Sequence, residues 1–244
     1  MSTKIAALLV AALMMVGVAS ASEGEGLEPV NIRLDDVASM QRGARLFFNY
    51  CSGCHSLQYL RYSRLAEDLQ LDPKEVQKNF MFAGGKIGDP AINHMPAADA
   101  TKWFGKAPPD LSLEARSKGS DWIYNYLKSF YVDPSRPLGW NNTVFPNASM
   151  PNALWELQGL QVPIMKPASE GHDAAVERLE LKTPGRQNAE EFDRTVHDIS
   201  AFLQYAGEPA ALKRESMGVW VLLYLGLFTL LAYLLKHEFW KDVH

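Results

Sequence analysis

The feature that most constrains this sequence is the run Cys-Ser-Gly-Cys-His at residues 51–55, which contains both cysteines of the chain. This C-x-x-C-H spacing lets two thiols add to the vinyl groups of a haem while the imidazole ligates the iron. A structural disulfide or a thioredoxin-like redox pair also uses C-x-x-C, but neither requires histidine at the next position. A zinc site would need a second pair of ligands at a recognisable spacing, which the sequence lacks. We therefore predict one covalently bound haem c on Cys51 and Cys54, with His55 as an iron ligand.

The first 21 residues have the order of a secretory signal peptide. Lys4 precedes an apolar run over residues 5–18, and the small residues Ala19-Ser20-Ala21 follow. The apolar run is too short to span a bilayer stably, and a mitochondrial transit peptide would be rich in arginine. We expect residues 1–21 to be the signal peptide of a bacterial, periplasmic protein. A retained N-terminal anchor is the alternative.

A second apolar segment lies near the C-terminus. Residues 217–235 contain no charged side chain and are just long enough to cross the hydrocarbon core of a membrane. A buried core helix is the alternative interpretation. We predict a haem domain over residues 22–209, a transmembrane anchor over 210–236 and a short cytoplasmic tail over 237–244.

The charge of the chain narrows the class of partner. The sequence has 24 basic and 28 acidic residues, a formal net charge of −4. Without Lys4 in the leader the balance is 23 against 28, or −5, and the four charged residues after position 235 cancel. An acidic domain argues against nucleic acid as a partner and favours a basic protein. Glu67-Asp68 and Glu190-Glu191 are candidates for the docking face, although such pairs are more often solvated surface.

A helix is predicted between Asp35 or Asp36 and the cysteine motif, because apolar residues recur there at helical spacing. Gly43 lies inside this helix, where glycine costs about 1 kcal/mol relative to alanine. We therefore expect another helix to cross closely over Gly43, and the segment 188–207 is the candidate.

That candidate helix has clear boundaries in the sequence. Asn188 and Glu191 have the spacing of a capping box, an apolar stripe follows, and Gly207 and Pro209 end it.

Three other segments lie between these features. A further helix is predicted to be capped by Ser120 or Asp121 and to bury an apolar face over residues 122–131. Residues 80–110 are rich in Gly, Pro and Asn and predict a long loop. Residues 152–187 show no clear period, although a short hairpin fits.

Two sequons, Asn141-Asn142-Thr143 and Asn147-Ala148-Ser149, match the glycosylation pattern. The pattern is short and common, and the leader is of bacterial type. We interpret both matches as coincidence.

The order of these features resembles the cytochrome c1 family, the haem subunit of the quinol–cytochrome c reductase (bc1) complex. Besides the leader, the cysteine motif and the C-terminal segment, the resemblance rests on Pro-Pro-Asp-Leu-Ser at 108–112, on Arg116 and on Met150-Pro151. It spans nearly the whole mature chain, and the order of the motifs is more specific than any one of them. The loop before Pro108 is shorter than in mitochondrial members.

The resemblance implies a mainly α fold: a class I cytochrome c-like haem domain with long loops, plus one C-terminal transmembrane helix. It implies that Cys51 and Cys54 hold the haem and that His55 is one axial ligand. Met150 would be the second axial ligand, and Arg116 would pair with a haem propionate.

The implied function is electron transfer. Iron saturated by histidine and methionine has no open position for a substrate and passes one electron at a time. By the resemblance, the electron comes from a Rieske iron–sulfur subunit, in a complex with cytochrome b, and goes to a soluble or membrane-bound cytochrome c. The chain would be an electron-transfer subunit of the bacterial inner membrane and not an enzyme on its own. The alternatives are a haem enzyme or gas sensor with an open sixth position, and an anchored cytochrome serving another oxidase or dehydrogenase.

The second axial ligand has three candidates in the sequence, His94, Met95 and Met150. In the class I pattern the ligand methionine follows the helix predicted near residue 121, as Met150 does. Pro151 holds the residue before it in an extended conformation, but Met95 also precedes a proline. We predict Met150 as the ligand.

Overall fold

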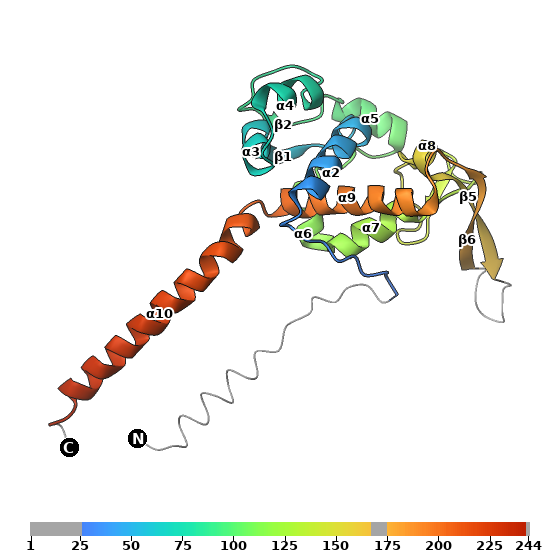
Figure 1. The fold of residues 1–244 in the computed structure, drawn as a ribbon. Coiled ribbons are helices and arrows are strands. Elements are labelled where there is room, and N and C mark those ends of the chain that lie inside the picture. The colour runs from blue at the N-terminus through green and yellow to red at the C-terminus, as the bar shows by residue number, and fades with distance from the viewer. Residues whose placement is uncertain (1–25, 167–174, 243–244) are drawn as a thin grey trace.

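The computed structural model describes residues 26–166 and 175–242, and it is mainly helical, as predicted (Figure 1). The helices are α2 (Val37–Tyr50), α3 (Tyr62–Asp68), α4 (Pro73–Phe80), α5 (Ala97–Phe104), α6 (Glu114–Lys118), α7 (Ser120–Lys128), α8 (Trp155–Gln158), α9 (Ala189–Gly207) and α10 (Ala211–Phe239). Antiparallel strand pairs in the described part are β1 (Leu57–Arg61) with β2 (Pro90–Ala91), β3 (Phe130–Val132) with β4 (Trp140–Asn142), and β5 (Gly159–Lys166) with β6 (Ala175–Pro184). The leader predicted over residues 1–21 lies outside the described residues.

Helices α2 and α9 cross in the middle of the domain (Figure 1). Gly43 is at the crossing point, against Asp198 and Phe202. A Cβ atom at Gly43 would overlap the backbone oxygen of Asp198 and would lie 2.7 Å from Cβ of Phe202. The carboxylate of Asp198 also ties the two helices together, because it accepts hydrogen bonds from Ser39 Oγ at 2.6 Å and Arg42 Nε at 2.6 Å. The predicted close crossing over Gly43 is confirmed.

Both crossing helices begin where the sequence predicts. The Asp36 carboxylate caps α2 by accepting from the backbone N–H of Ser39 at 3.0 Å. At α9, Asn188 and Glu191 exchange two side-chain to backbone hydrogen bonds of 2.9 Å, which is the predicted capping box. Helix α9 ends at Gly207, also as predicted.

An aromatic cluster fills the space beside this crossing. Phe48 stacks on Phe80 with ring centroids 4.9 Å apart, and Phe47 lies 5.5 Å from Phe202. These side chains are buried, and each such ring contributes about 1.5–3 kcal/mol relative to its exposed state. The cluster fixes the last turn of α2, from which the cysteine motif begins.

The segment around α7 differs from the prediction. Helix α7 ends before Phe130 and Tyr131, which lie in β3 and pair with β4. Neither predicted cap residue caps α7, because Gly119 holds the cap position. The Asp121 carboxylate accepts instead from the backbone N–H of Val30 at 2.7 Å, so it fixes the N-terminal segment of the domain.

Two stretches contain more regular structure than expected. The predicted loop over residues 80–110 includes β2 and the helix α5. The irregular stretch over 152–187 includes α8 and the hairpin β5–β6, whose strands have 8 and 10 residues and are longer than a short hairpin.

Helix α10 extends away from the domain, at the opposite end from the β5–β6 hairpin (Figure 1). Its 29 residues would be about 44 Å long, and Met217–Phe239 is apolar enough to cross a membrane, with none of that stretch buried in the described structure. The first turn of α10 packs on the domain, where Ala211 is buried and Arg214 pairs with Glu208. The predicted C-terminal membrane-spanning helix is therefore present as one long apolar helix.

Candidate functional site

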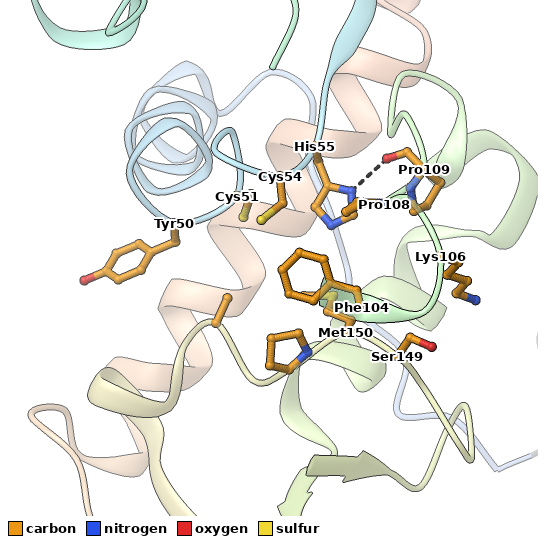
Figure 2. A pocket seen from close by; sticks show the side chains of 12 residues that line it. Tyr50, Cys51, Cys54, His55, Phe104, Lys106, Pro108, Pro109, Ser149 and Met150 are labelled. Carbon is orange, nitrogen blue, oxygen red and sulfur yellow. Dashed lines mark hydrogen bonds between the residues drawn. The ribbon is translucent and has the colours of Figure 1, made fainter. Parts of the chain in front are cut away.

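The cysteine motif follows the C-terminal end of α2 and folds into a compact turn. Cys51 is the C-cap residue, and its N–H donates to Phe47 O at 2.8 Å. Its carbonyl accepts from the N–H groups of Cys54 at 3.0 Å and His55 at 2.9 Å. Because of this backbone turn, both thiols and the imidazole point toward one cavity (Figure 2).

The thiols do not have the surroundings of a redox pair. Burial raises the pKa of the Cys51 thiol to about 12, and burial also raises the pKa of Cys54. A thioredoxin-like pair needs a thiolate stabilised by a helix N-terminus or a nearby cation, whereas these cysteines follow a helix C-terminus. These surroundings therefore do not favour the thiolate that a redox pair requires.

The imidazole of His55 is held in one tautomer. Its Nδ1 lies 2.7 Å from the carbonyl oxygen of Pro109, and because a carbonyl can only accept, Nδ1 carries the proton. The other ring nitrogen, Nε2, keeps its lone pair and points into the cavity (Figure 2). His55 is only 9% exposed, and burial lowers its pKa, which favours the neutral ring that a metal ligand requires.

The segment that carries Pro109 is fixed by hydrogen bonds to the chain just after the histidine. Leu111 N–H donates to Ser56 O at 2.9 Å. Gln58 N–H donates to the Asp110 carboxylate at 2.9 Å. The Pro-Pro-Asp-Leu-Ser motif thus places the carbonyl that orients the imidazole.

Two adjoining cavities form the site, with volumes of about 90 and 230 Å³. The side chains that line both cavities are Cys51, His55, Lys106, Pro109, Ser149 and Met150. In Figure 2, the cysteines and His55 lie on one side, and Phe104 and Met150 lie on the other.

The structure separates the candidate second ligands. Met150 lines both cavities together with His55 and Cys51. Met95 and His94 line a different cavity, which touches the edge of His55 but neither cysteine. The cavity between the thiols and the imidazole therefore includes Met150 and excludes Met95.

Arg116 does not line either cavity. Its side chain is 63% exposed, and its guanidinium lies 3.7 Å from Glu208. Lys106 and Lys118 line the cavity walls instead, and sequence reasoning did not single them out. Lys118 lies four residues after Glu114 on α6, so the two side chains share one face of the helix and line the same cavity.

The residues of this site fit a covalently bound haem. Two thiols lie at the edge of an apolar cavity, a neutral imidazole nitrogen points into it, and a thioether lines its other side. The remaining walls are chiefly aromatic and aliphatic, as a macrocycle would require; they include Trp122, Tyr126, Leu127 and Leu203.

A comparison with protein families decides the relationship. The model of the Cytochrome C1 family matches residues 32–89 and 84–243. The chain belongs to the cytochrome c1 family. Family membership implies a covalent haem c, and the cysteines that it requires are Cys51 and Cys54.

Curated relatives of the chain carry two different names. The chain is 51% identical over 222 residues to cytochrome c1 of Allochromatium vinosum, covering 91% of each chain. It is 39% identical over 238 residues to the ammonia monooxygenase gamma subunit of Nitrosomonas europaea, covering 97% of each. It is 30% identical to cytochrome c1 of Rhodospirillum rubrum, over 85% of this chain and 83% of that one.

Membership in the cytochrome c1 family makes the chain a haem electron carrier of a family anchored in membranes, and α10 is the matching candidate anchor.

The structure changes the interpretation of Glu67-Asp68, one of the two acidic pairs expected on a docking face. The Asp68 side chain is 3% exposed and accepts from Arg64 Nε at 2.8 Å, while its neighbour Glu67 lies 3.6 Å from Lys213. Asp68 therefore supports the fold and is not available to a docking partner.

Proposed function

We propose that this chain passes single electrons from a Rieske iron–sulfur protein to a cytochrome c acceptor, within a ubiquinol–cytochrome c reductase complex. The observation that carries the proposal is the cavity where Cys51, Cys54, His55 and Met150 meet. Cys51 and Cys54 would hold one haem c through thioether bonds, and His55 and Met150 would ligate its iron.

The side chains of His55 and Met150 suit a haem iron that transfers electrons and does not bind a substrate. When bound, a haem c supplies an iron that gains and loses one electron at a time. His55 offers Nε2 because its Nδ1 is committed to Pro109. Met150 offers a thioether sulfur, a ligand that raises the reduction potential. If His55 and Met150 both ligate the iron, no position would be left on it for a substrate.

The cavity walls are chiefly apolar, and the charged side chains among them are Lys106, Glu114 and Lys118. Trp122 stacks on Tyr126 with ring centroids 4.8 Å apart, and burial raises the pKa of Tyr126 to about 12, so its hydroxyl stays neutral. Lys106 and Lys118 add positive charge at the walls, where the acidic propionates of a haem need compensation. The pairing of Arg116 with a propionate stays a prediction.

The membrane helix and the charge of the domain support a location in a membrane and a basic partner protein. Helix α10 would be a single-pass anchor in a bacterial inner membrane, with residues 22–209 in the periplasm and the tail over 237–244 in the cytoplasm. Cytochrome b and the Rieske protein would be neighbours in the complex. The acidic domain would attract a basic acceptor and raise the rate of encounter.

A role in ammonia oxidation is the second candidate. It rests on the 39% identical relative, which is named as an ammonia monooxygenase subunit and is covered over 97% of its length. Both candidate functions use the same haem site and anchor, and they differ in the proteins that surround them.

Purification of the full-length chain from its own membranes in mild detergent distinguishes the two functions. We expect cytochrome b and a Rieske protein to co-purify, and the sample to reduce cytochrome c with quinol. Cys51→Ser combined with Cys54→Ser should abolish this activity and leave no haem on the chain after acid-acetone extraction. Co-purification with an ammonia-oxidising complex, without quinol oxidation, would contradict the proposal.

A further inference from the structure

The loop that carries Met150 contains almost no regular secondary structure. It runs from the end of β4 at Asn142 to the start of α8 at Trp155. A loop of this kind leaves backbone N–H groups without partners from a helix or sheet, and buried N–H groups need partners. The structure shows that side-chain amides supply them.

Asn142 holds the start of this loop. Its side chain is buried, at 1% exposure, and its amide makes three hydrogen bonds. The Oδ1 atom accepts from the N–H groups of Val144 at 2.9 Å and Phe145 at 3.0 Å. The Nδ2 group donates to the carbonyl of Tyr126 at 2.8 Å, which fastens the loop to α7.

Asn141 holds the middle of the loop in the same way. Its side chain is 8% exposed, and its Oδ1 accepts from Asn147 N–H at 2.8 Å. Its Nδ2 donates to the Asp133 carboxylate at 2.9 Å. Arg136 adds a bond of 3.1 Å to the carbonyl of Asn147, whose backbone has the left-handed φ of 64° that asparagine tolerates.

We propose that Asn141 and Asn142 are positioning residues that hold the Met150 loop against the cavity and so keep the methionine at the iron. The inference rests on the proposed role of Met150 as an axial ligand. Without these amides, four backbone N–H groups, those of Asn142, Val144, Phe145 and Asn147, lose these acceptors, and the loop opens more easily. The asparagine of the first sequon is thereby assigned a structural role, since its amide nitrogen is buried in a bond to Asp133.

The test measures how easily a foreign ligand displaces the methionine. Ferric full-length protein in detergent is titrated with imidazole, and the far-red charge-transfer absorption of the methionine–iron bond is recorded alongside. For Asn142→Leu, which removes all three bonds, we expect imidazole to bind at least about tenfold more tightly than in wild type. For Asn141→Ala we expect a change in the same direction, and that variant decides the question if Asn142→Leu does not fold.

Ser39→Ala is the matched control. Ser39 is 1% exposed and donates one buried hydrogen bond to Asp198, far from the loop in sequence. This variant should lower the melting temperature and leave the imidazole affinity unchanged. If the asparagine variants only lower the melting temperature, as Ser39→Ala does, the proposal is overturned.

Met150→Leu distinguishes the positioning role of the asparagines from the assignment of Met150 as an axial ligand. If that variant keeps the charge-transfer absorption, Met150 is not the ligand and both proposals fail. If it loses the absorption while the asparagine variants bind imidazole like wild type, the ligand assignment stands and the positioning role fails.

Discussion

The two sides of the cavity are held in different ways. On the side of Cys51 and His55, a helix crossing and an aromatic cluster fix the end of α2. On the side of Met150, buried amides fix a loop by bonds from side chain to backbone. The Cys51 and His55 side depends on apolar packing, which leaves no room for a side chain at Gly43. The Met150 side depends on hydrogen bonds to buried polar groups. The comparison indicates that damage to the first side should unfold the domain, whereas damage to the second should change the iron ligation.

The largest effect is expected from Gly43→Ala. The added methyl group would overlap the backbone of Asp198, so the helices must separate. Overpacking costs about 1–3 kcal/mol, and a clash with backbone places this variant at about 3 kcal/mol or above. Gly53→Ala is the control, because a Cβ there meets no atom within 4 Å. Thermal unfolding followed by circular dichroism compares them; equal melting temperatures for the two variants would refute the crossing as the support of this side.

A smaller effect is expected from the cations of α6. Lys118→Leu removes a positive charge from the cavity wall, which favours the oxidised state and should lower the midpoint potential by on the order of tens of millivolts. Arg116→Leu should shift it less, because Arg116 is exposed and lies beside Glu208. Redox titration of both variants measures the difference. A larger shift for Arg116→Leu would favour Arg116 over Lys118 as the propionate partner.

The smallest expected effect is a change in how the stability of the protein falls at low pH. Hydrogen bonds from Ser135 and Asn141 hold the pKa of Asp133 below its ordinary value of 3.8. A lowered folded-state pKa stabilises the fold above the ordinary value, and this contribution is lost as the pH falls through the folded-state pKa. Asp133→Asn should therefore lose slightly less stability than wild type between about pH 5 and about pH 3. Melting temperatures at both pH values test this; identical losses would show that Asp133 does not support the Met150 side.

The sequence predicted the packed side of the cavity better than the loop side. The cap at Asp36, the crossing over Gly43 and the capping box of α9 follow from local spacing, which a sequence records directly. Asp121 was expected to cap its own helix, but it binds a backbone group 91 residues away. Likewise, only the fold places Lys118 at the cavity and brings Asn142 against the carbonyl of Tyr126. These roles could not be predicted, because each depends on a contact that the local spacing of residues does not record.

The central claim is that the cavity holds a haem iron between His55 and Met150, and Met150→Leu compared with Met95→Leu tests it most directly. Met150→Leu should abolish the far-red charge-transfer absorption and let carbon monoxide bind the reduced protein. It should also lower the midpoint potential by a large part of the span that axial ligands control, roughly 0.8 V over all ligand types. Met95→Leu should change none of these, because Met95 lines a separate cavity. If Met95→Leu opened the iron to carbon monoxide and Met150→Leu left it closed, the account would be contradicted.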